Sequence, residues 1–405
     1  FIHILNIFNM KGKTFFSWLF MFSACALLAI GRVYDDRLVI AGINLVVIVS
    51  VVYLISLLIL FSSIKKIVFS KSKILLYSFY LLVLITGPIL WLIFDVTEFG
   101  FEKFINFWLI IVPISIIIIE KYNRDDALMI FYILLGVSCF LALLSSVGLS
   151  LSDRADGRLA ALGGGPIVFA RWMGFGILSF LFLPIKIRAF YKYLIILIFF
   201  ILALASGSRG PILALFLTGL VYIFLNFNRV IVKISLGVCL LASVLLFSEL
   251  GKQISKIGGL DRVFMNVSKK GGSSQSTSTR TNLAIGSFIL LQHYPLGVGA
   301  GNWQTVSNEI RPTHLMPLEY PHNLLLEVAC EYGLQTALLL LLLFIYIFHL
   351  SYYKMTQYRR DKTSLYPLLF YLFLFLFLNS LISGMLNDSR LLFIVISFII
   401  IHKPL

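Results

Sequence analysis

The sequence contains few of the residues that form polar surfaces, disulfides and metal sites. Asp, Glu, Lys and Arg make up 13% of its 405 residues, against roughly 25% in an average soluble domain. The four cysteines form no Cys-x-x-Cys pair: Cys25, Cys139, Cys239 and Cys330. A disulfide framework and a thiolate metal site are therefore not expected.

The apolar residues point instead to a membrane protein. Hydrophobic residues make up 60% of the chain and the mean hydropathy is +0.98. Apolar runs of about 20 residues, the length that crosses a bilayer, recur along it. We expect an all-α, polytopic membrane protein, with residues 1–405 as a single transmembrane domain of about 12 spans. The expected spans are 15–30, 38–61, 74–94, 104–119, 127–149, 166–184, 193–206, 211–225, 230–248, 323–350, 365–386 and 391–402.

The apolar run from Phe15 to Ile30 follows basic residues, as the apolar part of a signal peptide does. Met10, the first methionine, precedes Lys11 and Lys13, so we expect it to be the natural start and residues 1–9 to be an extension. No small-residue cleavage pattern follows the run. We therefore expect it to be the first transmembrane helix.

Basic residues predict the orientation, because cytoplasmic loops of membrane proteins carry an excess of Lys and Arg. Placing the N-terminus inside puts every strongly basic loop in the cytoplasm. These loops contain Lys65 and Lys66, Lys121 and Arg124, Lys186 and Arg188, Arg229 and Lys233, and Arg359 and Arg360. The net charge of +15 therefore reflects topology and does not indicate nucleic-acid binding.

Two arginines lie at or inside apolar spans. Arg209 occupies the short turn 206–211 at an expected outer membrane edge, where glycines let the backbone approach a phosphate and a proline suits the next helix. It is either a fixed cation for phosphate or an interfacial arginine that contacts lipid headgroups or caps a helix. Arg171 lies inside a span and is expected to line a cavity, unless it pairs with Asp153 or Asp156.

The hydrophilic stretch 249–321 is expected to form one large outer loop between spans nine and ten. Within it, Ser and Thr residues precede Arg280, which we expect to begin a helix that reaches His293. The N-terminus of a helix favours anions. Arg280 is therefore a candidate anion ligand, the alternative being a solvated loop arginine.

Gly297, Gly299 and Gly301 resemble a nucleotide-binding loop, but no strand precedes them and no lysine follows. We interpret them as a tight turn that lets Trp303 pack or stack on a sugar.

Pro321-His322-Asn323 joins the outer loop to an apolar segment. The imidazole of His322 titrates near neutral pH and could take a proton from a hydroxyl; the alternative is an ordinary interfacial histidine. Asn323 is expected to cap a single helix of about 28 residues, roughly 42 Å long, which exceeds the ~30 Å hydrocarbon core. Glu327 and Glu331, on one face, are expected at its outer end. The histidines lack zinc-like spacing, so a metal is not expected.

Together these motifs resemble the bacterial O-antigen polymerase and O-antigen ligase superfamily. The resemblance is carried by Ser206-Gly207-Ser208-Arg209-Gly210, by Arg280 with the segment His293 to Gly301, and by Pro321-His322-Asn323 followed by Gly333. In the N-terminal half, the span pattern, Asp156-Gly157-Arg158 and Gly163 to Pro166 also match.

The resemblance implies a glycosyltransferase of the C-type architecture that acts at the periplasmic face of the bacterial inner membrane. Its substrates would be glycans on undecaprenyl diphosphate, used without nucleotide sugar, metal or cofactor. Arg209 and Arg280 resemble the arginines that hold the diphosphate, and His322 resembles the histidine proposed as base. Further expected substrate-binding residues are Arg158, Arg171, Asn323, Trp303 and Glu327. Membrane lipids and a chain-length regulator protein are further candidate partners; nucleic acid is not expected.

Three functions remain open at this point. Arg158, the Gly163–Pro166 stretch and Arg171 favour an O-antigen polymerase over an O-antigen ligase, which would transfer O-antigen to the lipid A core. A transporter or flippase is the alternative of another class, although no internal repeat of the kind common in transporters is visible.

Overall fold

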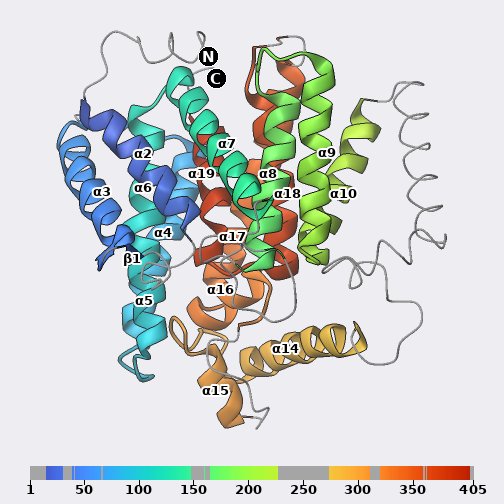
Figure 1. The fold of residues 1–405 in the computed structure, drawn as a ribbon. Helices are drawn as coiled ribbons and strands as arrows, with labels where there is room; N and C mark the ends of the chain where they lie inside the picture. The colour runs from blue at the N-terminus through green and yellow to red at the C-terminus, as the bar shows by residue number, and fades with distance from the viewer. Residues whose placement is uncertain are drawn as a thin grey trace.

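The computed structural model describes residues 15–30, 39–40, 42–64, 67–146, 159, 165–226, 273–310, 320–358, 361 and 363–401. Within these residues the chain is helical except for one short hairpin, in which β1 (Val39–Ile40) pairs antiparallel with β2 (Ile43–Asn44). Most of the helices run side by side in one bundle (Figure 1). The expected all-α class is confirmed.

The helices of the N-terminal half lie between Phe15 and Ser146. They are α2 (Phe15–Ala29), α3 (Leu45–Ser62), α4 (Lys71–Leu90), α5 (Glu98–Asn106), the π-helix η2 (Phe107–Ile111), α6 (Val112–Lys121) and α7 (Arg124–Ser146). Three consecutive elements, α5, η2 and α6, make one continuous apolar helix over Glu98–Lys121.

The C-terminal half begins with three apolar helices and ends with three more, and a group of shorter elements lies between them. Its helices are α8 (Pro166–Phe182), α9 (Ala189–Ala205), α10 (Arg209–Leu225), α14 (Ser273–His293), α15 (Trp303–Ile310), α16 (Leu324–Tyr332), α17 (Leu334–Gln357), α18 (Tyr366–Ser383), the 3₁₀ turn η3 (Asn387–Ser389) and α19 (Arg390–Ile400).

Among the described residues, six helices are long and apolar enough to cross a membrane, and α2, α8, α9 and α10 are shorter apolar helices. The chain is therefore a helical membrane protein that crosses the bilayer several times. The predicted total of about 12 spans stays a prediction. The expected ninth span, 230–248, lies outside the described residues.

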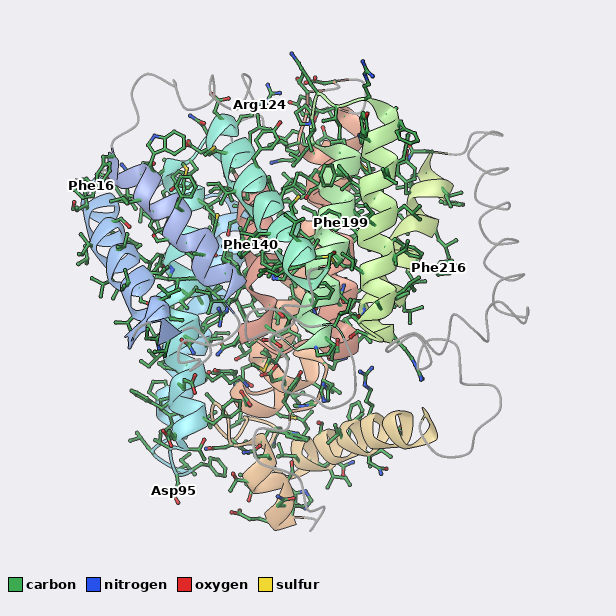
Figure 2. The ribbon with its side chains drawn as sticks, viewed as in Figure 1. Phe16, Asp95, Arg124, Phe140, Phe199 and Phe216 are labelled. Carbon is green, nitrogen blue, oxygen red and sulfur yellow. The ribbon has the colours of Figure 1, made fainter. Side chains whose placement is uncertain are left out.

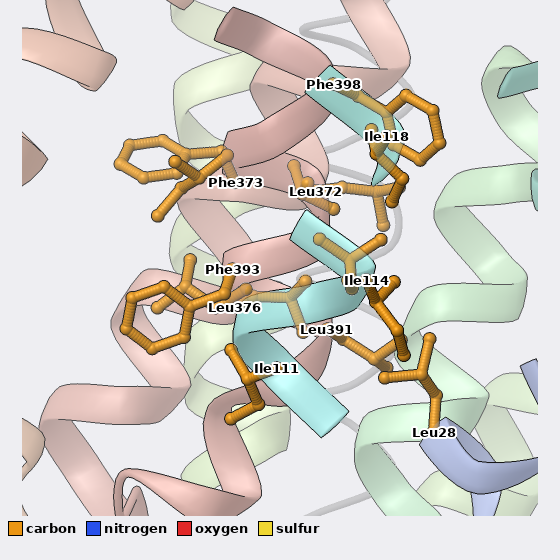
Figure 3. Close-up of a cluster of buried hydrophobic side chains, with 14 of the residues drawn as sticks. Leu28, Ile111, Ile114, Ile118, Leu372, Phe373, Leu376, Leu391, Phe393 and Phe398 are labelled. Carbon is orange, nitrogen blue, oxygen red and sulfur yellow. The ribbon is translucent and has the colours of Figure 1, made fainter. Parts of the chain in front are cut away.

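The centre of the bundle is formed by α18 and α19, which are predominantly apolar; all of α19 and most of α18 are buried. Figure 3 shows Ile111, Ile114 and Ile118 of the η2–α6 segment close to Leu391 and other apolar side chains of α18 and α19. Other apolar helices, such as α3 and α9, expose large hydrophobic side chains, as expected for surfaces that face lipid.

Three short helices, α5, α15 and α16, gather with the longer, more polar helix α14 at one end of the bundle, the lower end in Figure 1. We call this the loop end. Asp95 lies at the loop end and Arg124, from an expected cytoplasmic loop, at the opposite end (Figure 2). The segments that carry the C-terminal motifs therefore share the end opposite a basic loop.

The predicted continuous helix 323–350 is wrong, because the chain breaks at Gly333 between α16 and α17. Gly333 has a φ of +88°, and a Cβ there would lie 2.5 Å from the carbonyl oxygen of Leu296. The N–H of Leu334 donates instead to the carbonyl of Pro295, at 2.9 Å. A contact with the preceding loop thus replaces the hydrogen bonds of an uninterrupted helix.

The glycine-rich loop fits against this break. The N–H of Val298 donates to the carbonyl of Cys330, and the N–H of Gly299 donates to the carbonyl of Glu331, both at 2.9 Å and near the end of α16. Gly297, Gly299 and Gly301 all have positive φ, a conformation that glycine adopts without steric cost. The loop, which connects α14 to α15, therefore attaches the end of α16 to these two helices through its backbone.

Candidate functional site

The candidate residues meet around the last residues of α18 and the turn that leads from it to α19. We call residues 381–389 the α18–α19 connection. The polar backbone groups at its start would lack partners if α18 simply ended there. Side chains from α8 and from the start of α16 supply them.

Arg171 reaches this connection from the middle of α8. Its Nη2 donates to the carbonyl of Ser383 at 2.7 Å, and its Nη1 lies 3.9 Å from Oδ2 of Asp388. The residue is buried. The predicted alternative partners, Asp153 and Asp156, lie outside the described residues, so the observed carboxylate near Arg171 is one that the sequence interpretation did not consider.

Arg209 is the first residue of α10 and is exposed. The predicted place of Pro211 in the first turn of this helix is confirmed. The next residue, Gly210, packs against the α18–α19 connection, since a Cβ there would lie 3.0 Å from Ile382 and 3.4 Å from Oγ of Ser383. Arg209 therefore projects from a helix N-terminus, which itself favours anions, beside the residue that Arg171 contacts.

His322 occupies a strained backbone position just before α16, with a φ of +56°, and it is the one non-glycine residue of the described chain with a positive φ. Its ring lies 4.2 Å from the ring of Tyr320, centroid to centroid. Its Nδ1 is buried and has no hydrogen-bond partner among the described residues. Backbone strain of this kind concentrates at functional sites, and the unpartnered nitrogen is available to a ligand.

Burial and the surrounding charges set the protonation of His322. Its pKa is lowered from 6.5 to about 4, first by burial and then by the guanidinium of Arg280. Asp388 raises it and Arg171 lowers it further. His322 is therefore neutral at pH 7, the form that can accept a proton, and it lies among cations that would attract an anion.

Arg280 is half-buried on α14, which packs against α16. The prediction that Arg280 begins this helix is wrong, because α14 starts at Ser273 and Arg280 is its eighth residue. The positive end of the helix dipole does not act at Arg280. Its own guanidinium charge, which acts on both His322 and Tyr320, remains available to an anion.

Asn323 caps α16 as predicted, because its Oδ1 accepts the N–H of Leu326 at 3.1 Å. Its Nδ2 donates to the carbonyl of Leu381 at 3.0 Å. Both polar ends of this side chain thus contact protein in the structure. Asn323 fixes the start of α16, and with it the neighbouring His322, to the end of α18.

Glu327 was expected to bind substrate at the outer end of a long helix, but its side chain is fully buried. One carboxylate oxygen contacts the ammonium of Lys103, and the other accepts the N–H of Leu386 at 2.8 Å. Burial raises the pKa of Glu327, and Lys103 opposes that rise. The structure therefore places Glu327 in the protein interior behind the site.

Trp303 and Arg158 complete the predicted set. Trp303 is 1% exposed, and its indole N–H donates to Oγ of Ser287 at 3.0 Å. It packs α15 against α14, so its ring is not presented for stacking on a sugar. Arg158 lies outside the described residues.

Metal ligands do not gather in this part of the chain. In the ranges that the structure describes, no group of three or more His, Cys, Asp or Glu side chains could hold a metal ion. The candidate site is instead defined by guanidinium groups, one imidazole and one carboxylate.

Sequence reasoning missed Asp388 and Lys103. Asp388 follows an expected span and belongs to the short polar stretch Asn387 to Arg390 at an outer turn. A polar turn between two long apolar spans on the same side as the other motifs was the available signal. Lys103 carried no comparable signal, since a lysine at the edge of a span is usually interfacial.

Comparison with known proteins supports the expected family. The family model described as O-antigen ligase matches residues 193–341, a range that includes Arg209, Arg280 and His322. No curated protein matches the chain. The family match supports the placement of this chain in the O-antigen polymerase and O-antigen ligase superfamily.

Proposed function

We propose that the chain is an O-antigen polymerase. It joins oligosaccharide repeat units carried on undecaprenyl diphosphate at the periplasmic face of the bacterial inner membrane. The observation that carries glycosyl transfer is the neutral imidazole of His322 among the charges of Arg280, Arg171 and Asp388. A neutral base beside cations suits a reaction that deprotonates a hydroxyl and expels an anion. The choice of a polymerase over a ligase rests on the sequence stretch that contains Arg158, Gly163–Pro166 and Arg171.

In the proposed reaction, the diphosphate of the lipid-linked donor binds at Arg209 and Arg280. A hydroxyl oxygen of the acceptor sugar attacks the anomeric carbon of the donor, and its proton passes to His322. The bond between the anomeric carbon and the diphosphate oxygen breaks, and the diphosphate leaves with the electron pair. The single displacement inverts the anomeric configuration. Because negative charge grows on the diphosphate, the arginines stabilise the transition state more than the ground state.

Binding of the donor should also strengthen the base. The cations that lower the pKa of His322 in the free protein would be partly neutralised by the diphosphate. An added negative charge near an imidazole raises its pKa. His322 would thus be a better proton acceptor in the complex than in the free protein, so the site is arranged to act once the donor is bound.

The description of the matching family favours a second candidate, an O-antigen ligase, which would transfer O-antigen from the same carrier to the lipid A core. The same arginines and histidine would serve both reactions, which differ in the acceptor. A transporter gains no specific support from the His322 geometry, because transport breaks no bond to the sugar and expels no diphosphate.

Deletion of the gene, followed by electrophoresis of the lipopolysaccharide, separates these functions. A polymerase defect gives core plus a single repeat unit. A ligase defect gives bare core, with polymer retained on the lipid carrier, and a flippase defect gives bare core with single units on the carrier. The polymerase proposal fails if the deletion strain accumulates polymer on the carrier. Complementation with wild type and with His322→Ala at equal protein level shows whether the phenotype depends on the site.

A further inference from the structure

A buried ion cluster lies behind the candidate site, where α5 meets α16. The Lys103 ammonium contacts the carboxylates of both Glu327 and Glu331, the latter at 2.5 Å. All three side chains are at most 2% exposed. Burying charges is costly, and one carboxylate would suffice to neutralise Lys103. The second carboxylate therefore calls for a further role.

The two glutamates differ in their contacts. Glu327 uses its other oxygen, Oε2, to accept the N–H of Leu386 in the α18–α19 connection, at 2.8 Å. The Glu331 side chain contacts Lys103 through its Oε2. Because both oxygens of Glu327 face N–H donors, an amide could not replace its carboxylate without turning an N–H toward one of them.

The position of Glu327 relates these contacts to the site. His322 and Asn323 lie at the start of α16, and Glu327 lies one turn further along the helix. Leu386 directly precedes the turn η3, which contains Asp388. The Asn323–Leu381 and Glu327–Leu386 hydrogen bonds thus attach the first turn of α16 to the α18–α19 connection at two points.

We propose that Glu327, oriented by Lys103, is a positioning residue that holds the segment bearing Asp388 against the helix that follows His322. This inference rests on the proposed transfer reaction at His322. It assigns Glu327 a role behind the site in place of the substrate contact expected from the sequence. Asp388 and His322 interact electrostatically, so a displaced connection would change the field at the base.

The test compares Glu327→Gln with Glu331→Gln in the purified full-length protein, assayed with a lipid-diphosphate-linked oligosaccharide as donor. Both variants remove one carboxylate from Lys103, but only Glu327→Gln disturbs the contact with Leu386. We expect Glu331→Gln to keep kcat within about threefold of wild type and Glu327→Gln to lose at least tenfold in kcat. A tenfold loss corresponds to an increase of about 1.36 kcal/mol in the activation free energy. The donor KM should change little, because the diphosphate ligands are untouched.

A second pair of variants leaves the ion cluster intact and addresses the case in which Glu327→Gln folds poorly. Leu386 has a φ of −56°, which proline accepts, so Leu386→Pro removes the N–H that Glu327 accepts. Leu386→Ala keeps the N–H and loses the side chain. We expect kcat per folded molecule to be lower in Leu386→Pro than in Leu386→Ala.

The outcomes distinguish this inference from the proposed function. The positioning role is overturned if the two glutamine variants, or the two Leu386 variants, have equal kcat values. The proposed function stands in that case, provided that wild type transfers glycan and His322→Ala does not. Absence of transfer by the folded wild-type protein, or full transfer by His322→Ala, overturns the proposed function itself.

Discussion

The guanidinium of Arg171 donates to the backbone carbonyl of Ser383 at 2.7 Å and thereby ties the middle of α8 to the end of α18. Its other terminal nitrogen lies near Asp388. Arg171 therefore links α8 to both Ser383 and the turn that carries Asp388. Its contribution to substrate binding, expected from the sequence, would be through charge more than through direct contact.

Replacing Arg171 by methionine is therefore expected to destabilise the protein. The buried carbonyl of Ser383 would lose its side-chain donor, at a cost of about 1–3 kcal/mol. The thermal unfolding midpoint of the detergent-purified variant should fall accordingly. Lys186→Met is the matched control, because Lys186 is exposed beyond the other end of α8 and should change stability by no more than about 0.5 kcal/mol. Equal midpoints for the two variants would contradict this role.

Gly333→Ala tests the break between α16 and α17. Alanine at a φ of +88° is strained, and its Cβ would meet the Leu296 carbonyl, so we expect a loss of about 1–3 kcal/mol. Gly136→Ala, on an open face of α7 with nothing within 4 Å of the added Cβ, should be neutral or slightly stabilising. If the two alanine variants unfold at the same temperature, α16 and α17 form one helix in solution.

The fold class and the gathering of motifs at one end were predictable, because span lengths and the alternation of basic loops fix which segments share a side. The break at Gly333 was not, since a single glycine does not by itself end a helix and only the contact with Pro295 decides it. The start of α14 was also missed, because Ser and Thr suit both caps and loops. Asp388 and Lys103 meet their partners only through helix packing, which a single sequence does not specify.

The pH dependence of the transfer reaction should reveal the pair Arg280 and His322. The base must be neutral, so kcat/KM should fall as pH drops through the pKa of His322 in the free protein, about 4. Arg280→Gln removes a cation that lowers this pKa and should move the acid limb of kcat/KM to higher pH. In wild type, the acid limb of kcat should also lie at higher pH than that of kcat/KM, because the bound diphosphate raises the pKa.

Arg209→Gln is the control for this shift. The guanidinium that lowers the pKa of His322 most is that of Arg280, so loss of Arg209 should weaken donor binding and move the acid limb of kcat/KM less than loss of Arg280 does. Identical pH profiles for Arg280→Gln and wild type would mean that the guanidinium does not act on the base.

Acidification should also weaken the folded state through His322. Its pKa is about 4 in the folded protein against an ordinary value of 6.5, so the unfolded chain binds a proton more readily. The stability that neutral His322 contributes is fully present above about pH 6.5 and declines as pH falls toward 4. The His322→Gln variant should lose less stability over this window than wild type, as measured by thermal unfolding at each pH. A wild-type loss no greater than that of the variant would contradict the lowered pKa.

The most direct test of the central claim is transfer by the purified protein, reconstituted in lipid vesicles with undecaprenyl-diphosphate-linked repeat units as both donor and acceptor. Wild type is predicted to form polymer and release undecaprenyl diphosphate without nucleotide sugar. Folded His322→Ala is predicted to lose at least about 100-fold in rate, the lower range for loss of a general base. Polymer formation by His322→Ala at the wild-type rate would contradict the account.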